Sequence, residues 1–185
     1  MDALTLLTTR YSLSRLTAPA PSGEALENIQ RAALQVPDHG HLRPWRFIVA
    51  KNREALLKLG DIFAEAAIED NPTMATELVE RARELPLRAP MVIVCIAKVT
   101  EHPKIPVLEQ HYSAACAVMA MQQAAFAQGF AGIWRTGGYA QYDFVKQSLG
   151  LADDDEIVGF LYLGTPAAEP AKRHPVAIDD YFSEL

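Results

Sequence analysis

The chain is 185 residues long; half of its residues are hydrophobic, 22% are charged, and the formal net charge is −6. This balance is typical of a folded globular chain with its own core, so a disordered chain is excluded and residues 1–185 are expected to form one domain. The acidic balance, with only short basic clusters, argues against nucleic acid as a partner.

Signals for export or membrane insertion are not found in the sequence. The stretch "MDALTLLTTRYS" lacks the basic segment and long apolar run of a secretory signal, and no apolar run reaches the roughly 18 to 20 residues of a membrane helix. Cys95 and Cys116 both lie in apolar runs and are expected to be buried free thiols, not parts of a disulfide or zinc site. We therefore expect a soluble cytoplasmic protein with no membrane partner.

The first half of the chain predicts four helices and two strands. A short helix over 3–10 leads to the connector "TAPAPSG", and Ser22 is placed to cap a second helix that stops at Pro37. The β-branched and aromatic run over 46–50 predicts a strand. The remaining elements are a helix capped by Asn52, a charged helix over 74–85 and an apolar strand over 89–99 that is covered on both faces.

The second half predicts one long helix, two strands and a short helix. The run over 109–128 is apolar around most of its circumference, which is typical of a buried helix. Strands over 130–139 and 157–164 flank a short helix over 143–149, and the proline-rich tail needs a surface to lie on. Because the helices come in groups around about four strands, the pattern predicts an α+β fold with helices flanking a mostly antiparallel or mixed sheet.

Polar side chains gather in three short segments. Arg10, Ser12 and their neighbours follow the first helix and can offer guanidinium and hydroxyl groups to a phosphate. The segment "PDHGHLRPWRF" at 37–47 surrounds an indole with histidines and arginines, and "IWRTGG" joins an indole and a cation to two glycines. Each segment could instead be an ordinary loop or helix end, so the inference rests on the three together.

Other kinds of site are disfavoured. His39 and His41 have H-x-H spacing, but no suitably spaced third and fourth ligands accompany them, so no metal is expected. Neither G-x-G-x-x-G nor G-x-x-x-x-G-K-[ST] occurs, and G-x-S-x-G is also missing. A Rossmann cofactor site and serine hydrolase chemistry are therefore not expected.

Four segments, in order along the chain, resemble the nitroreductase family. "TRYSLSRL" resembles the family's opening "RRS-x-R", and "PDHGHLRPWRFIVA" resembles its "PS-x-x-N-x-QPW-x-F-x-V" segment. "CAVMAMQQAAFAQGFAGIWRTG" and "IVGFLYLGTP" match later segments, so the resemblance covers nearly the whole chain. It implies an intertwined α+β homodimer that binds FMN at the subunit interface, with terminal segments wrapped around the partner.

The resemblance also implies roles for particular residues. Arg10, Tyr11 and Ser12 would hold the phosphate and ribityl chain, while Gln35 and His39 would reach the flavin from the other subunit. The isoalloxazine ring and its polar edge would be lined by Trp134, Arg135 and Thr136. The nicotinamide nucleotide would bind at the helix end formed by Ala124, Ala125, Phe126, Ala127, Gln128 and Gly129.

The implied activity is that of an FMN-dependent NAD(P)H oxidoreductase. NADH or NADPH would pass hydride to N5 of FMN and leave, and a nitroaromatic, quinone or similar flat acceptor would then take the electrons, giving ping-pong kinetics. Because the cofactor carries the difficult chemistry, no side chain is expected to be catalytic. The acceptor and the preference between NADH and NADPH stay open.

The sequence departs from the family pattern at two positions. Tyr11 stands where a second arginine is usual, which removes one cation from the phosphate site unless Arg15 or Arg173 replaces it. Arg43 replaces the glutamine of "QPW" and adds positive charge near the flavin or its substrate. These changes bear on how strongly FMN is held.

Three alternatives share parts of this pattern. A non-catalytic flavin carrier or redox sensor would use the same binding residues. Flavin-dependent dehalogenation or flavin fragmentation would need a lid insertion or an added domain that the sequence does not contain. A metal-dependent hydrolase is the most distant alternative.

Overall fold

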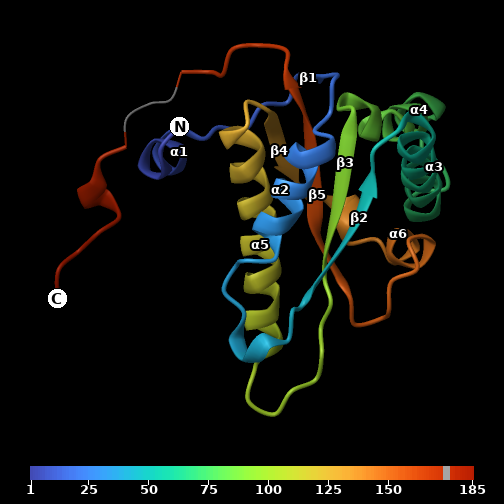
Figure 1. Ribbon diagram of the computed structural model, residues 1–185. Helices are drawn as coiled ribbons and strands as arrows, with labels where there is room; N and C mark the ends of the chain where they lie inside the picture. Colours follow the sequence, from blue (N-terminus) through green and yellow to red (C-terminus); the bar gives the residue numbers. More distant parts are fainter. Residues whose placement is uncertain (173–175) are drawn as a thin grey trace.

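An antiparallel sheet divides the protein into two layers of helices (Figure 1). The computed structural model describes residues 1–172 and 176–185. Four strands run in the order β1–β5–β3–β2, and β4 pairs with β5 as well; every pairing is antiparallel. The strands are β1 (Leu16–Thr17), β2 (Trp45–Ala50), β3 (Met91–Ala97), β4 (Ala131–Arg135) and β5 (Glu156–Pro166).

The two faces of the sheet carry different helices. One face is covered by α2 (Gly23–Ala33) and α5 (Val107–Ala127), and the other by α3 (Arg53–Asp70), α4 (Thr76–Arg83) and α6 (Asp143–Ser148). Along β3, Met91, Ile93 and Cys95 pack on the α5 side, whereas Val92, Val94 and Ile96 pack on the α3 side. This alternation explains the unbroken apolar run, since both faces of the strand are buried.

Local sequence signals explain several helix boundaries. The Asn52 side chain accepts a hydrogen bond of 2.8 Å from the amide of Ala55 and so caps α3, as predicted. Ser22 occupies the N-cap position of α2, but its side chain makes no capping hydrogen bond. Gly150 has φ +67° and follows Leu149, the C-cap residue of α6, so it allows the chain to turn away after this helix.

The prediction of an α+β fold with a mostly antiparallel sheet is confirmed. The two-residue strand β1 was not predicted, because so short a strand carries no periodicity. Cys95 is buried as predicted, whereas the prediction for Cys116 is wrong: it lies on an exposed face of α5. Apolar residues occur on every side of α5, so the sequence does not show which side of the helix packs against the sheet.

The two ends of the chain lie on the α5 side of the sheet. The short helix α1 (Ala3–Thr9) has no buried residue, and residues 176–185 stand clear of the sheet and of α5 (Figure 1). Within the described residues, no helix combines the length and apolar character needed to cross a membrane.

Candidate functional site

The segment between α1 and β1 is fixed against α5 and β4 by a buried amide. Gln122, 4% exposed, donates hydrogen bonds to the carbonyl of Gly132 at 3.0 Å and to Oγ of Ser12 at 3.3 Å. The guanidinium of Arg10 lies 3.5 Å from the same hydroxyl. Tyr11 packs edge-on against Phe126, with 5.0 Å between ring centroids. A guanidinium and an exposed hydroxyl are thus held together at the start of β4.

The end of β4 presents its side chains to opposite faces of the sheet. The indole of Trp134 packs on the α5 side and donates a hydrogen bond of 3.1 Å to the carbonyl of Val158. Arg135 points to the α3 side, where its guanidinium carbon lies 6.0 Å from the centroid of the Tyr162 ring. The two side chains therefore leave β4 on opposite faces, although Trp134, Arg135 and Thr136 all line one hollow at the end of the strand.

A hollow of about 500 Å³ adjoins Arg135 and Thr136 on the α3 side. Gly137, with φ +98°, turns the chain there, and Arg88 contributes a second guanidinium. Neither arginine forms an ion pair with any residue in the described ranges 1–172 and 176–185. The hollow therefore suits an anionic or electron-rich group. Sequence reasoning missed Arg88, because no local motif links "LPLRAP" to β4.

The same two arginines act on the buried phenol of Tyr162. Burial raises the pKa of Tyr162 to about 12, because the phenolate would lose its hydration. Arg135 and Arg88 oppose this shift, since their positive charges favour the ionised phenol. Tyr162 therefore stays neutral at physiological pH and lines the hollow as a hydroxyl group.

The second predicted cluster lies beside the N-terminal end of α5. His39 begins the short 3-10 turn His39–His41, and its Nδ1 lies 2.6 Å from Oε2 of Glu109. The carboxylate of Asp38 accepts a hydrogen bond of 2.7 Å from the amide of Arg43 and closes the loop. Gln35 is exposed just before this loop. The loop is thus anchored to α5 while leaving His39 60% exposed.

Within one chain, this second cluster is remote from Ser12. Glu109 anchors His39, and Gln122 anchors Ser12, on the same helix. The 13 residues between these anchors correspond to about 20 Å along an α-helix. One copy of the chain therefore brings Arg10, Tyr11 and Ser12 together near β4 but does not bring Gln35 and His39 to them.

The predicted nicotinamide segment is largely occupied by packing. Ala125 is fully buried, and the Gln128 amide donates to the carbonyls of Ala25 and Ala124 at 3.2 and 2.9 Å. Asn28 donates to the Gln128 side-chain oxygen at 3.3 Å, which ties this helix end to α2. Ala127 and Gly129 are exposed, and the Phe126 ring is partly buried against Tyr11.

The remaining candidate cations have separate positions. Arg15 is exposed beyond the Ser12 segment, and Arg43 has φ +50° in the His39 loop. Arg173, the other candidate for replacing the missing cation, lies outside the described residues. In the part of the chain that the structure describes, no group of three or more His, Cys, Asp or Glu side chains is arranged to hold a metal ion.

Known structures share this fold over the whole chain. A nitroreductase-like family protein from Bacillus cereus superposes with a TM-score of 0.84 at 20% identity, covering 100% of this chain and 96% of that one. A nitroreductase with bound FMN from Bacteroides fragilis superposes with a TM-score of 0.73 at 20% identity, covering 100% and 99%. The architecture is thus that of nitroreductase-like proteins.

Sequence comparisons give a closer relationship. The model of the nitroreductase family matches residues 7–165. The chain is 48% identical over 168 residues to the Escherichia coli (strain K12) protein named "Putative NAD(P)H nitroreductase YdjA", covering 90% of this chain and 89% of that protein. A Haemophilus influenzae protein named "Putative NAD(P)H nitroreductase" is 42% identical over 180 residues, covering 97% and 96%. The chain belongs to the nitroreductase family, which confirms the resemblance found in the sequence.

Proposed function

We propose that the protein is an FMN-dependent NAD(P)H oxidoreductase that delivers electrons to flat acceptors such as nitroaromatics or quinones. The observation that carries this proposal is the Gln122 bridge, which fixes Ser12 against the first residues of β4 while Arg135 and Thr136 lie at its other end. Family membership and the FMN-bound relative support the same cofactor. The names of the Escherichia coli and Haemophilus influenzae relatives support NAD(P)H as electron donor.

The chain's own residues bind and orient the cofactor. Arg10 supplies a guanidinium, and Ser12 an exposed hydroxyl, to the phosphate and ribityl chain. Thr136 and the guanidinium of Arg135 provide polar groups at the ring end. The indole N–H of Trp134 is already bonded to Val158, so Trp134 contributes through its position and not as a donor. When bound, FMN would supply the hydride-transfer chemistry, and so no side chain needs to act as acid or base.

A homodimer completes this site. Apolar side chains at helical spacing are exposed along α5, at Leu108, Tyr112 and Met119. In a two-fold dimer with the α5 helices antiparallel, the N-terminal end of one helix lies beside the C-terminal end of the other. That arrangement carries Gln35 and His39 of one subunit toward Arg10 and Ser12 of its partner, across the 20 Å or so that separates them in one chain.

The proposal is tested first by colour and turnover. The purified protein is expected to be yellow, to release FMN on denaturation, and to bleach on addition of NADH or NADPH. Addition of a quinone or nitroaromatic should restore the colour with parallel-line ping-pong kinetics. A colourless protein that takes up no added FMN would contradict the proposal. Bleaching without turnover of any acceptor would instead identify a flavin carrier or redox sensor.

A matched pair of variants tests the site itself. His39→Ala should weaken FMN retention while the far-ultraviolet circular dichroism stays unchanged. His41→Ala, in the same turn, is the control and should retain FMN as the parent does. Equal FMN affinity in both variants would remove His39 from the site.

A further inference from the structure

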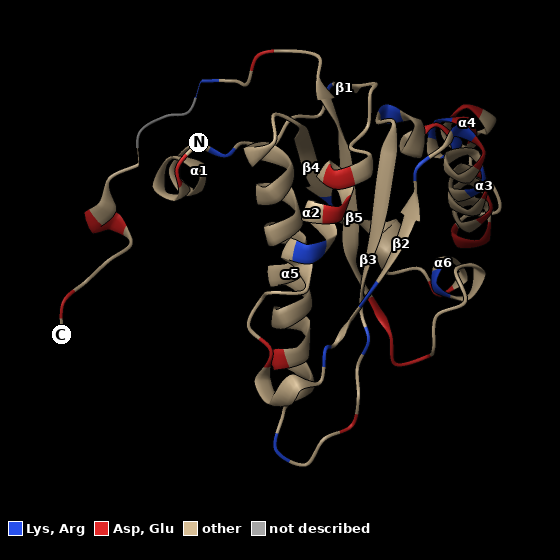
Figure 2. Cartoon of the chain, viewed as in Figure 1, with Lys and Arg blue, Asp and Glu red and all other residues tan. Residues whose placement is uncertain are grey.

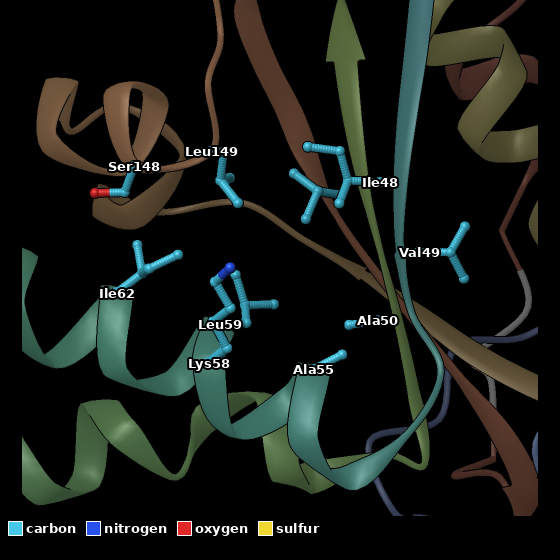
Figure 3. Close-up of a pocket in the computed structure, with 10 residues that line it drawn as sticks. Ile48, Val49, Ala50, Ala55, Lys58, Leu59, Ile62, Ser148 and Leu149 are labelled. Carbon is cyan, nitrogen blue, oxygen red and sulfur yellow. The ribbon is translucent and has the colours of Figure 1, made fainter.

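A second, smaller hollow lies on the α3 side of the sheet, between β2, α3 and the end of α6. Its volume is about 230 Å³, and its walls include Ile48, Ala50, Leu59, Ile62 and Leu149 (Figure 3). An apolar cavity of roughly 150 Å³ is large enough to hold benzene. The space therefore suits the apolar part of a small organic molecule. It lies on the face of the sheet opposite α5 and shares no lining residue with the Arg88–Arg135 hollow.

The hollow is left open where two alanine side chains, one on β2 and one on α3, lie opposite each other and are too small to fill the space between these elements. Ala50 of β2 and Ala55 in the first turn of α3 face one another at one end of it (Figure 3). Ile48 and Leu149 form the opposite part of the wall. Ala55 is half-buried and belongs to α3, so a larger side chain there can enter the hollow without a substitution in the sheet.

The lining is mostly apolar, and Lys58 is the one cation in it among the described residues. Ala55, Lys58, Leu59 and Ile62 are spaced i, i+3, i+4 and i+7, which places them on one face of α3. Lys58 lies on the same face but is exposed to solvent, whereas Leu59 and Ile62 are buried. Figure 3 shows its amino group directed toward the space between Leu59, Ile48 and Leu149.

The ammonium group of Lys58 has no carboxylate partner among residues 1–172 and 176–185, the part of the chain that the structure describes. Glu54 precedes it by one helical turn, the favourable spacing for an ion pair, yet no ion pair or hydrogen bond of Lys58 occurs among residues 1–172 and 176–185. Ser148 adds a hydroxyl at the rim. An unpaired cation over an apolar hollow is complementary to a molecule with an apolar body and one negative charge.

We propose that this hollow, the Lys58 pocket, binds a small aliphatic monocarboxylate, with its carboxylate on Lys58 and its chain between β2 and α3. The ligand is distinct in shape and chemistry from a flat electron acceptor. Binding here does not require the flavin, so the pocket is independent of the proposed reaction. It is a ligand site on the far side of the sheet from the dimer surface.

Octanoate and 1-octanol, which share one chain length, are the probes. Octanoate should bind the purified protein with one site per chain by isothermal titration calorimetry, and its methylene protons should receive saturation from the protein in NMR difference spectra. Lys58→Met keeps the length of the side chain but removes the charge. It should weaken octanoate binding by up to about fivefold, the effect of losing one exposed charge pair of up to about 1 kcal/mol, and leave 1-octanol binding unchanged.

Two further variants fix the location. Lys104→Met, on the exposed loop before α5, removes the same charge elsewhere and should leave octanoate affinity unchanged. Ala55→Leu should fill the hollow, abolish binding of both probes and keep or raise the melting temperature. The proposal is overturned if octanoate does not bind, if Lys58→Met and Lys104→Met behave alike, or if well-folded Ala55→Leu still binds octanoate.

Discussion

At the scale of single residues, Gln122 links the core to the candidate site. Its buried amide donates to both Gly132 and Ser12, so its removal leaves a buried carbonyl with one partner fewer and frees the Ser12 segment. Gln122→Ala should lower the free energy of unfolding by about 1 to 3 kcal/mol and weaken FMN retention. Urea unfolding and FMN fluorescence titration measure the two effects. Gln123→Ala, one position along, is the control; equal losses in both variants would show that Gln122 has no special role.

Tyr162 gives a residue-scale prediction for stability at high pH. Its pKa is about 12 in the folded protein against an ordinary value of 10.0, so the unfolded chain loses this proton first. The stabilisation is complete below pH 10 and is lost as pH rises from 10 toward 12, by roughly 3 kcal/mol in all, since each pKa unit corresponds to about 1.4 kcal/mol. Tyr162→Phe should show a shallower decline of unfolding free energy over this range. Parallel curves for the two proteins would contradict the assignment.

The sequence pointed to some residues of the candidate site and not to others. Arg10, Ser12 and Arg135 were predicted because they lie in short segments that resemble family motifs. Gln122 and Arg88 were not predicted, since each reaches the candidate site only through folding and their neighbours in the sequence are ordinary helix or turn residues. The sequence alone also does not tell which face of the sheet each of Trp134 and Arg135 occupies, because that depends on how β4 pairs with β5.

At the scale of elements, α3 and α4 approach one another through a glycine. A Cβ at Gly60 would collide with the backbone carbonyl of Arg83 at the end of α4. Alanine usually stabilises a helix interior relative to glycine, but here Gly60→Ala should destabilise the protein by about 1 to 3 kcal/mol. Thermal unfolding checks this. As a control, Glu65→Ala, at an exposed position of α3, should change the free energy of unfolding by no more than about 0.5 kcal/mol. If Gly60→Ala is instead more stable than the parent protein, α3 and α4 can move apart without loss of stability, and the prediction is wrong.

Elements with strong periodicity or caps were predicted well, and those made by tertiary pairing were not. The helix after Asn52 and the apolar strand at 89–99 were recognisable because cap chemistry and burial on both faces leave local signals. The strand β1 depends on pairing of Leu16 and Thr17 with Pro166 and Thr165, nearly 150 residues away. The apolar helix at 109–128 was recognised, but its exposed face was not, because that face is itself apolar.

At the scale of the whole molecule, charge and apolar surface are distributed unequally. Charged side chains gather on α3 and α4, whereas Glu109 is the one Lys, Arg, Asp or Glu in α5 (Figure 2). The exposed face of α5, formed by Leu108, Tyr112, Cys116 and Met119, therefore offers a continuous apolar stripe. Exposed apolar stripes of this kind mark interaction surfaces. Leu4 and Leu7 of α1 are exposed on the same side of the sheet and extend that surface.

The proposed dimer predicts how Cys116 reacts. If α5 packs on its partner, Cys116 is shielded and should react slowly with an aromatic disulfide reagent in the parent protein, while Cys95 is buried in the core and its thiol has a raised pKa. Tyr112→Glu places a charge in the stripe and should yield a monomer by analytical ultracentrifugation, with at least a tenfold faster Cys116 reaction and loss of FMN. Leu78→Glu, at an exposed apolar position on α4, should remain dimeric, flavin-bound and slow to react. A parent protein that sediments as a monomer, or a Tyr112→Glu monomer that keeps FMN as tightly as the parent, would show that one chain forms the flavin site alone.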